Sequence, residues 1–146
     1  MKKTITTTIL VVLVCLVQQS CGGLLAGVVN RQIINTDTTE YVDDEMKSFE
    51  KYNPTDAQRE KYREIQHEYI TDLKENARKE KTKEISNSAS INVFYWIDYK
   101  KEAKVVELLD KDQLRKYRSE GGGESEKDFL KHRKRVKKMG YNVDDL

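Results

Sequence analysis

The residues that could take part in chemistry include one regular row of carboxylates. Glu60, Glu64, Glu68 and Asp72 recur at intervals of four residues, with His67 beside them, so a helix would align them on one face. Oxygen ligands of this kind suit a hard divalent cation. A linear row does not converge on one ion, however, and neighbouring basic residues relieve the repulsion between the carboxylates. We interpret the row as a solvated helix face and predict no metal site, with a weak divalent-metal surface as the alternative.

Other catalytic constellations are missing from the sequence. The glycines at 121–123 are not followed by the Lys-Ser/Thr pair of a phosphate-binding loop, and no apolar strand precedes them. No serine or cysteine lies in a recognisable nucleophile motif. His67 and His132 fall in different predicted helices, and only abundant carboxylates lie near them at metal-ligand spacing. We therefore predict a protein that is not an enzyme and needs no cofactor.

The densest run of charge is basic and lies near the C-terminus. It fills most positions of a predicted last helix with Lys131, Arg133, Lys134, Arg135, Lys137 and Lys138. Such a run could bind anionic lipid, lipopolysaccharide or acidic segments of a client protein. It could equally complement the negative end of the helix dipole. The sequence leaves both interpretations open.

The N-terminus carries the layout of a secretory signal. A basic start precedes the apolar run 9–17, which is too short to span a bilayer. Cys21 follows, in an arrangement similar to the lipobox of bacterial lipoproteins, where the cysteine receives a diacylglycerol and becomes the mature N-terminus. Ser20 fits the small residue required before that cysteine, whereas Gln18 replaces the usual leucine. We predict a signal peptide over residues 1–20 and lipidation at Cys21.

The predicted anchor determines the location and the state of the thiols. Such a lipoprotein lies in the cell envelope of a Gram-negative bacterium, attached to the inner or outer membrane and facing the periplasm. Cys15 is removed with the signal and Cys21 is acylated, so no disulfide stabilises the mature fold. Three alternatives remain open: ordinary signal-peptidase cleavage near Gly23 or Ala26, an uncleaved anchor running through Val29, and no lipidation.

Composition argues against a globally basic nucleic-acid-binding protein. The chain has 27 Lys and Arg against 25 Asp and Glu. Removal of the signal peptide takes away Lys2 and Lys3, so the basic count falls from 27 to 25 and the mature chain is nearly neutral. The remaining length suits one small domain.

A short segment occurs twice in the chain. The sequence from Thr55 to Arg63 recurs from Asp110 to Arg118 with a shared Gln-x-x-Lys-Tyr-Arg pattern. Each copy begins with an oxygen-bearing side chain three residues before a glutamine, which is the capping-box pattern. Thr55 with Gln58, and Asp110 with Gln113, are therefore predicted to start two helices in the same way.

The hydrophobic pattern predicts a helical domain over residues 54–119. The first helix is expected from Thr55 to about Glu84, with a narrow apolar stripe at helical spacing: Tyr62, Ile65, Tyr69 and Leu73. Residues 86–90 indicate a linker. The segment Ile91 to Tyr99 alternates like a strand but has no evident pairing partner, so we favour a helix from about Asn92 to Leu109. The second box then starts a helix over 111–119.

Two further segments flank this domain. Residues 21–53 are predicted to form a flexible tether, because their central part is polar and offers little to bury. Within them, Met46, Phe49 and Tyr52 could form a short turn that docks on the domain. Residues 124–140 are predicted to form a basic C-terminal helix that ends at Gly140.

The repeated box resembles the LTxxQ motif that occurs twice in Spy/CpxP-type periplasmic proteins. Pro54-Thr55-Asp56-Ala57-Gln58 matches the first copy at threonine and glutamine, and Leu109-Asp110-Lys111-Asp112-Gln113 matches the second at leucine and glutamine. The resemblance covers about residues 45–119. It implies small all-helical hairpins that dimerise into a curved cradle and act as envelope-stress chaperones without ATP. Some relatives bind zinc, but this chain lacks a histidine-rich region, which argues against that branch.

We expect an all-α fold, a small antiparallel helical hairpin or bundle with a disordered N-terminal tether. The expected function is ATP-independent binding of non-native or partner polypeptides, with clients or an envelope protein as partners, a homodimer as one assembly, and no nucleic acid. The expected contact surface consists of apolar and aromatic residues: Tyr62, Ile65, Tyr69, Phe94, Trp96 and Tyr99. The alternatives are an adaptor lipoprotein with one dedicated envelope partner and, third, a protein that responds to a divalent metal.

Overall fold

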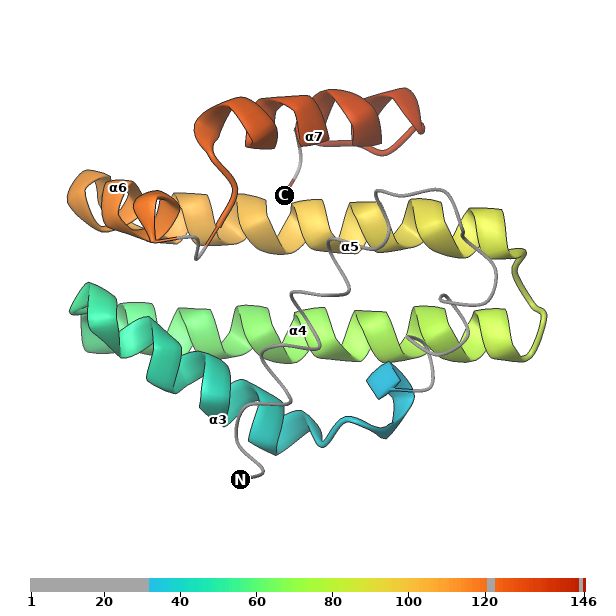
Figure 1. Cartoon of the computed structure of the whole chain (residues 1–146), viewed down its shortest axis with the longest axis horizontal. Helices are drawn as coiled ribbons and strands as arrows, with labels where there is room; N and C mark the ends of the chain where they lie inside the picture. The colour runs from blue at the N-terminus through green and yellow to red at the C-terminus, as the bar shows by residue number, and fades with distance from the viewer. Residues whose placement is uncertain (1–31, 121–122, 145) are drawn as a thin grey trace.

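A computed structural model describes residues 32–120, 123–144 and 146, and within these ranges the chain is helical and contains no strand. The elements are α3 (Thr38–Phe49), the 3-10 turn η1 (Glu50–Tyr52), α4 (Asp56–Lys81), α5 (Asn87–Leu108), α6 (Lys111–Ser119) and α7 (Glu126–Lys138) (Figure 1). The predicted all-α fold is confirmed. No helix in the described ranges is long and apolar enough to cross a membrane. The predicted signal peptide and the lipidation at Cys21 lie outside the described residues.

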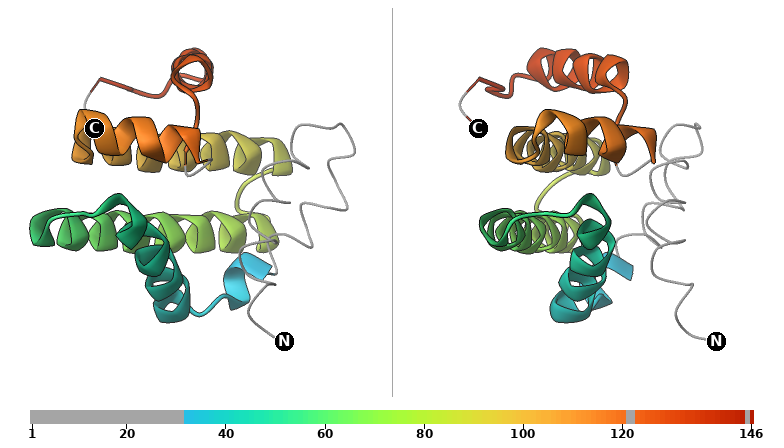
Figure 2. Two further views of the ribbon diagram at one scale, coloured as in Figure 1. Left: turned by 60° about the vertical axis from the view of Figure 1, so that its left-hand side comes forward. Right: turned by 90° about the vertical axis from the view of Figure 1, so that its left-hand side faces the viewer.

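The helices stack in the order α3, α4, α5 and α7. The long helices α4 and α5 form an antiparallel hairpin, with α3 packed on α4 and α7 packed on α5 (Figure 1). Figure 2 shows the same order from two other directions. The short helix α6 follows α5 and contacts η1, so the two ends of the predicted domain meet beside the start of α4.

Side-chain caps explain where the helices begin. Thr55 and Asp110 both form complete capping boxes: each accepts a hydrogen bond from the N3 amide, and the N3 glutamine accepts one from the cap amide. Asp37, Ser86 and Ser125 cap the other three helices. Because Ser86 is a cap, α5 begins at Asn87, and most of the predicted linker 86–90 is helix.

The two capping boxes lie side by side and bond to each other. The Nε2 atom of Gln58 donates to Oε1 of Gln113 at 2.7 Å, and Nε2 of Gln113 donates to Oε1 of Gln58 at 3.2 Å. Gln58 also donates to the carbonyl of Leu108, and Gln113 donates to the carbonyl of Tyr52. The repeated glutamines therefore join the start of α4 to the start of α6, in addition to capping each helix.

The predicted flexible tether is wrong for its second half. Residues 38–52 form α3 and η1, and α3 buries Tyr41, Val42, Met46 and Phe49 against α4. The Phe49 ring, which is 1% exposed, stacks on Tyr62 with 3.8 Å between ring centroids. Met46, Phe49 and Tyr52 pack on the domain as predicted. They do so from a full helix and the 3-10 turn that follows it, not from one short turn. The charged outward residues of that helix make its apolar face hard to recognise in the sequence.

The aromatic segment Ile91 to Tyr99 is helical, as favoured, and it lies at the centre of the stack. Ile97 joins the core shared with α3 and α4, with Phe94 packed against it. Tyr99 instead joins a second core with Val136 of α7, with Trp96 packed against it. A helix that is apolar on all sides is one that is covered on more than one side, and α4 and α7 provide that cover.

Candidate functional site

Two of the four carboxylates in the row on α4, Glu68 and Asp72, form ion pairs with lysines of α5. The Nζ atom of Lys100 lies 2.9 Å from Glu68 and 2.5 Å from Asp72, and Lys104 lies 2.6 Å from Glu68. Burial alone would raise the pKa of Glu68, but hydrogen bonds from Lys104 and Lys100 lower it below its ordinary value. The prediction of a fully solvated face is therefore wrong for Glu68 and Asp72, which hold α5 against α4.

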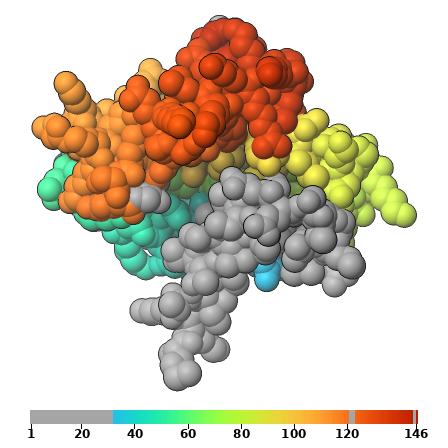
Figure 3. Space-filling view, turned by 45° about the horizontal axis from the view of Figure 1, so that its top comes forward, coloured from blue at the N-terminus to red at the C-terminus, as the bar shows by residue number. Residues whose placement is uncertain are grey.

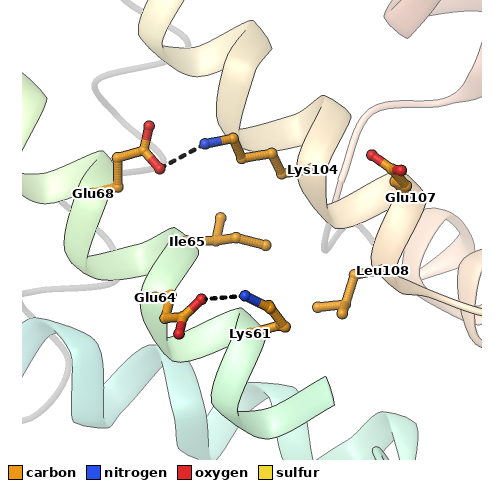
Figure 4. A pocket seen from close by; sticks show the side chains of 7 residues that line it. All are labelled: Lys61, Glu64, Ile65, Glu68, Lys104, Glu107 and Leu108. Atoms are coloured by element: carbon orange, nitrogen blue, oxygen red, sulfur yellow. Dashed lines mark hydrogen bonds and ion pairs between the residues drawn. The ribbon is translucent and has the colours of Figure 1, made fainter. Parts of the chain in front are cut away.

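A shallow groove of about 380 Å³ lies between α4 and α5 next to these ion pairs. Figure 4 shows its rim, where Lys104 pairs with Glu68 and Lys61 pairs with Glu64. Ile65 and Leu108 line it between the charged pairs. Lys61, Glu64, Glu68 and Lys104 are already paired with each other, so the charge in this groove that has no ion pair with the described residues is that of Glu107.

The predicted contact surface for clients is not a surface. Tyr62, Ile65, Tyr69 and Tyr99 are all buried, with Tyr62 4% and Tyr99 2% exposed. Phe94 and Trp96 are half-buried, and the Trp96 indole stacks on Tyr141 with 4.9 Å between centroids. Helix α3 covers Tyr62, α5 packs beside Ile65 and Tyr69, and α7 with the C-terminal segment covers Trp96 and Tyr99.

The basic patch divides into an inner and an outer part. Arg133 and Lys137 pair with Asp144 of the C-terminal segment, and Arg135 lies over the Tyr95 ring at 3.3 Å from its centroid. Lys131 pairs with Asp128 one turn earlier. Lys134 and Lys138 make no ion pair with the described residues, and neither does Lys127, which the sequence prediction left out.

These lysines share the side of α7 that points away from α5. We call outward face the exposed residues at helical spacing along this side: Lys127, Leu130, Lys131, Lys134 and Lys138. Figure 3 shows α7 as the outermost layer on this side of the molecule. Leu130, at 48%, is the most exposed of the large apolar side chains that the structure describes. Leu130 lies between Lys127 and Lys134 along this side, and a search for charge alone does not find it.

The inner face of α7 places His132 in a polar cluster. The side chain is 8% exposed; its Nδ1 atom lies 3.0 Å from Glu124 Oε1 and its Nε2 atom 2.8 Å from the carbonyl oxygen of Tyr95. Asp98 of α5 lies 4.0 Å from Nδ1. Burial alone would lower the pKa of His132, but the hydrogen bond and charge of Glu124 raise it.

This cluster was missed at the sequence level because its members are far apart in the chain. His132 lies eight residues from Glu124 and meets α5 at Tyr95, 37 residues away. Neither spacing matches a motif within one helix. The available signal was the burial pattern of α7, in which Phe129, His132 and Val136 follow at helical spacing and predict that the histidine faces inward.

Comparison of the chain with protein-family models, with curated proteins and with solved structures finds no match.

Proposed function

We propose that this chain is a lipid-anchored envelope protein, not an enzyme, whose helical domain is an adaptor for one dedicated polypeptide partner. The observation that carries the proposal is the outward face of α7, where the exposed Leu130 lies between Lys127 and Lys134, and where these two lysines and Lys138 have no ion pair in the described structure. The anchor is the predicted lipid at Cys21. The partner has a complementary acidic surface with a small apolar recess for Leu130.

The physical chemistry of this face favours specific docking. Charges at the rim of an interface steer association and set the orientation, while a buried apolar anchor provides much of the affinity. Lys127, Lys134 and Lys138 are exposed, so their contribution is screened and falls as salt rises. Leu130 is one turn from Lys127 and one turn from Lys134, so the apolar anchor lies between these two charged side chains.

The burial of the α4 stripe favours the adaptor over a promiscuous holdase. A holdase needs apolar surface available to many clients, whereas Tyr62 is buried against Phe49 of α3, and Ile65 and Tyr69 are buried on the side of α4 next to α5. The large apolar side chains that remain exposed in the described ranges are Leu130 and Leu146. Both belong to the C-terminal part of the chain, outside the region of resemblance to the chaperones.

Site-specific crosslinking in cells tests the adaptor. A photoreactive residue at position 134 is expected to give one discrete crosslinked product, whereas the same residue at the exposed position 111 gives none. Charge reversal of Lys127, Lys138 and Lys131 to glutamate should abolish the product. The matched control reverses three exposed lysines elsewhere, Lys81, Lys83 and Lys111, and leaves it intact. A smear of many products at position 134, or a product that survives reversal of the outward face, contradicts the proposal.

A second candidate function follows from how α3 covers the stripe. The contacts that hold α3 are the Phe49–Tyr62 stack and hydrogen bonds from Tyr41 to Gln66 and from Tyr62 to Glu45. If α3 were released, Tyr62 and the apolar face of α3 itself would become available, and the protein would act as an ATP-independent holdase. Phe49→Ser should then suppress aggregation of an unfolding test protein at equimolar ratio, where the unaltered chain does not. Equal scattering curves for both proteins, with helicity retained, would remove this candidate.

A further inference from the structure

Three potential metal ligands from separate parts of the chain meet between α5 and α7. Asp98 comes from α5, Glu124 from the segment before α7, and His132 from α7 itself. One ligand atom of each lies within 4.8 Å of the others. The histidine Nδ1 is 3.0 Å from a Glu124 oxygen and 4.0 Å from an Asp98 oxygen. The cluster is thus a convergent set, unlike the linear row on α4.

Each ligand is oriented by a neighbour outside the set. The Nε2 atom of His132 faces the carbonyl oxygen of Tyr95 at 2.8 Å, so the ring proton of a neutral imidazole belongs on Nε2. The lone pair of Nδ1 then points at the carboxylates. The Tyr69 hydroxyl donates to Oδ1 of Asp98 at 3.3 Å, which leaves Oδ2 facing the ring. Histidine ligands of metals are typically held in this way, by a carbonyl on the second nitrogen.

The two carboxyl groups of the cluster face a single histidine ring. The amide of Glu124 donates to the buried carboxyl of Glu102, whose pKa burial raises, so this neighbour does not count as a further charge. Neither Lys nor Arg forms an ion pair with Asp98, Glu102 or Glu124 in the described ranges. The second oxygen of Glu124, Oε2, is buried there without a hydrogen-bond partner. A buried carboxylate oxygen without a partner is costly unless a cation or donor satisfies it.

We propose that Asp98, Glu124 and His132 form a binding site for one divalent transition-metal ion, zinc being the cation that this ligand set suits. Zinc binds imidazole nitrogen and carboxylate oxygen at about 2.0–2.2 Å in a tetrahedron, so its ligand atoms lie about 3.3 Å apart. The separations of 3.0 and 4.0 Å from Nδ1 reach this value by shifts of less than an ångström. Three protein ligands leave the fourth position to water.

The bound ion would join α7 to α5 directly. The zinc-binding cluster lies on the inner side of α7, and the outward face lies on the opposite side of the same helix. The metal site needs no partner for its existence, so it stands independently of the proposed adaptor function.

Zinc binding by the full-length chain in detergent tests this inference. Equilibrium dialysis and thermal unfolding, followed by circular dichroism, are measured for the unaltered protein and for His132→Gln, Glu124→Gln and His67→Gln. The unaltered protein and His67→Gln, which lacks the exposed histidine of α4, should each bind one zinc ion at this site. At saturation zinc should raise their unfolding temperature by about 5–10 °C. None of the substitutions alters a cysteine, so binding to any free thiol is common to all four proteins.

The two site variants decide the outcome. Glu124→Gln keeps an oxygen beside the ring but loses the ligand charge, so it should remain folded and bind zinc at least about 10-fold more weakly. If His132→Gln unfolds without metal, Glu124→Gln alone carries the test. Equal zinc affinity and equal thermal shift in the unaltered protein and Glu124→Gln overturn the proposal. So does the absence of any zinc-dependent shift in the unaltered protein.

Discussion

Replacing Gln58 with alanine removes four hydrogen bonds at once, and the size of the loss tests whether the two capping boxes act as one unit. Gln58 accepts from the amide of Thr55, donates to the carbonyl of Leu108, and exchanges two bonds with Gln113. A net hydrogen bond contributes about 1 kcal/mol when partly buried, and less when water replaces it. We expect Gln58→Ala and Gln113→Ala each to lower the free energy of unfolding by about 2–3 kcal/mol.

The double variant should lose less than the sum of the two single variants. The two amide–amide bonds can be removed only once, so the interaction energy is expected to be about 1 kcal/mol. Urea unfolding at pH 7, followed at 222 nm, measures all four proteins, and the slope against urea should not change. The matched control is the pair Thr55→Ala and Asp110→Ala, which removes the caps but not the glutamine pair. These changes should cost about 1 kcal/mol each and add independently.

Additivity of the glutamine variants within about 0.3 kcal/mol would refute the reasoning, because contacting residues that share bonds must couple. A loss below about 0.5 kcal/mol for either single variant would refute it as well. In that case the boxes would be two independent helix starts that happen to lie next to each other.

Three further outcomes are expected. Burial raises the pKa of Glu45, with the opposing charge of Lys101 and the Tyr62 hydrogen bond too weak to offset it. Above the ordinary carboxyl value of 4.5, the folded state keeps a proton that the unfolded state releases. Stability therefore falls as pH rises through the raised pKa, and Glu45→Gln should remove that slope in urea midpoints from pH 4 to 8. Gly123→Ala should cost about 1–3 kcal/mol in the same assay, because its Cβ would overlap the Tyr117 ring. Phe49→Ala should cost about 3–5 kcal/mol, and hydrogen exchange should show α3 opening more often than the remainder of the protein.

Local rules were sufficient where a feature depends on a few consecutive residues. The two capping boxes follow from the spacing of Thr55 to Gln58 and of Asp110 to Gln113, and both form. The end of α7 follows from Gly140, whose φ of +92° belongs to the left-handed region that glycine tolerates. The helical state of residues 91–99 required one step more, namely the lack of a strand for them to pair with.

The incorrect predictions concern which face of a helix is covered by another helix. The spacing of Tyr62, Ile65, Tyr69 and Leu73 correctly predicts one apolar helix face. The assignment of Tyr62 to a client surface is wrong, because α3, which packs on it, lies in the segment predicted to be a tether. That segment has an acidic outward side, with Asp43 and Asp44 next to the buried Val42, and its average polarity resembles that of a linker. The average composition of a segment does not show which of its residues share a helix face. The spacing of Val42, Met46 and Phe49 does show it.

The two faces of α7 make the zinc and adaptor proposals separable in one protein. His132 and Val136 face α5 and the second core, while Lys134 and Lys138 point to the other side. Loss of the inner contacts would let α7 turn or detach, and the outward lysines would lose their fixed spacing relative to Leu130. Glu124→Gln keeps the packing of Val136 in the second core, so it should leave the crosslink at position 134 intact, and reversal of Lys138 should leave zinc affinity unchanged. Either proposal can therefore fail without the other, because each variant alters one side of the helix and leaves the other side as it is.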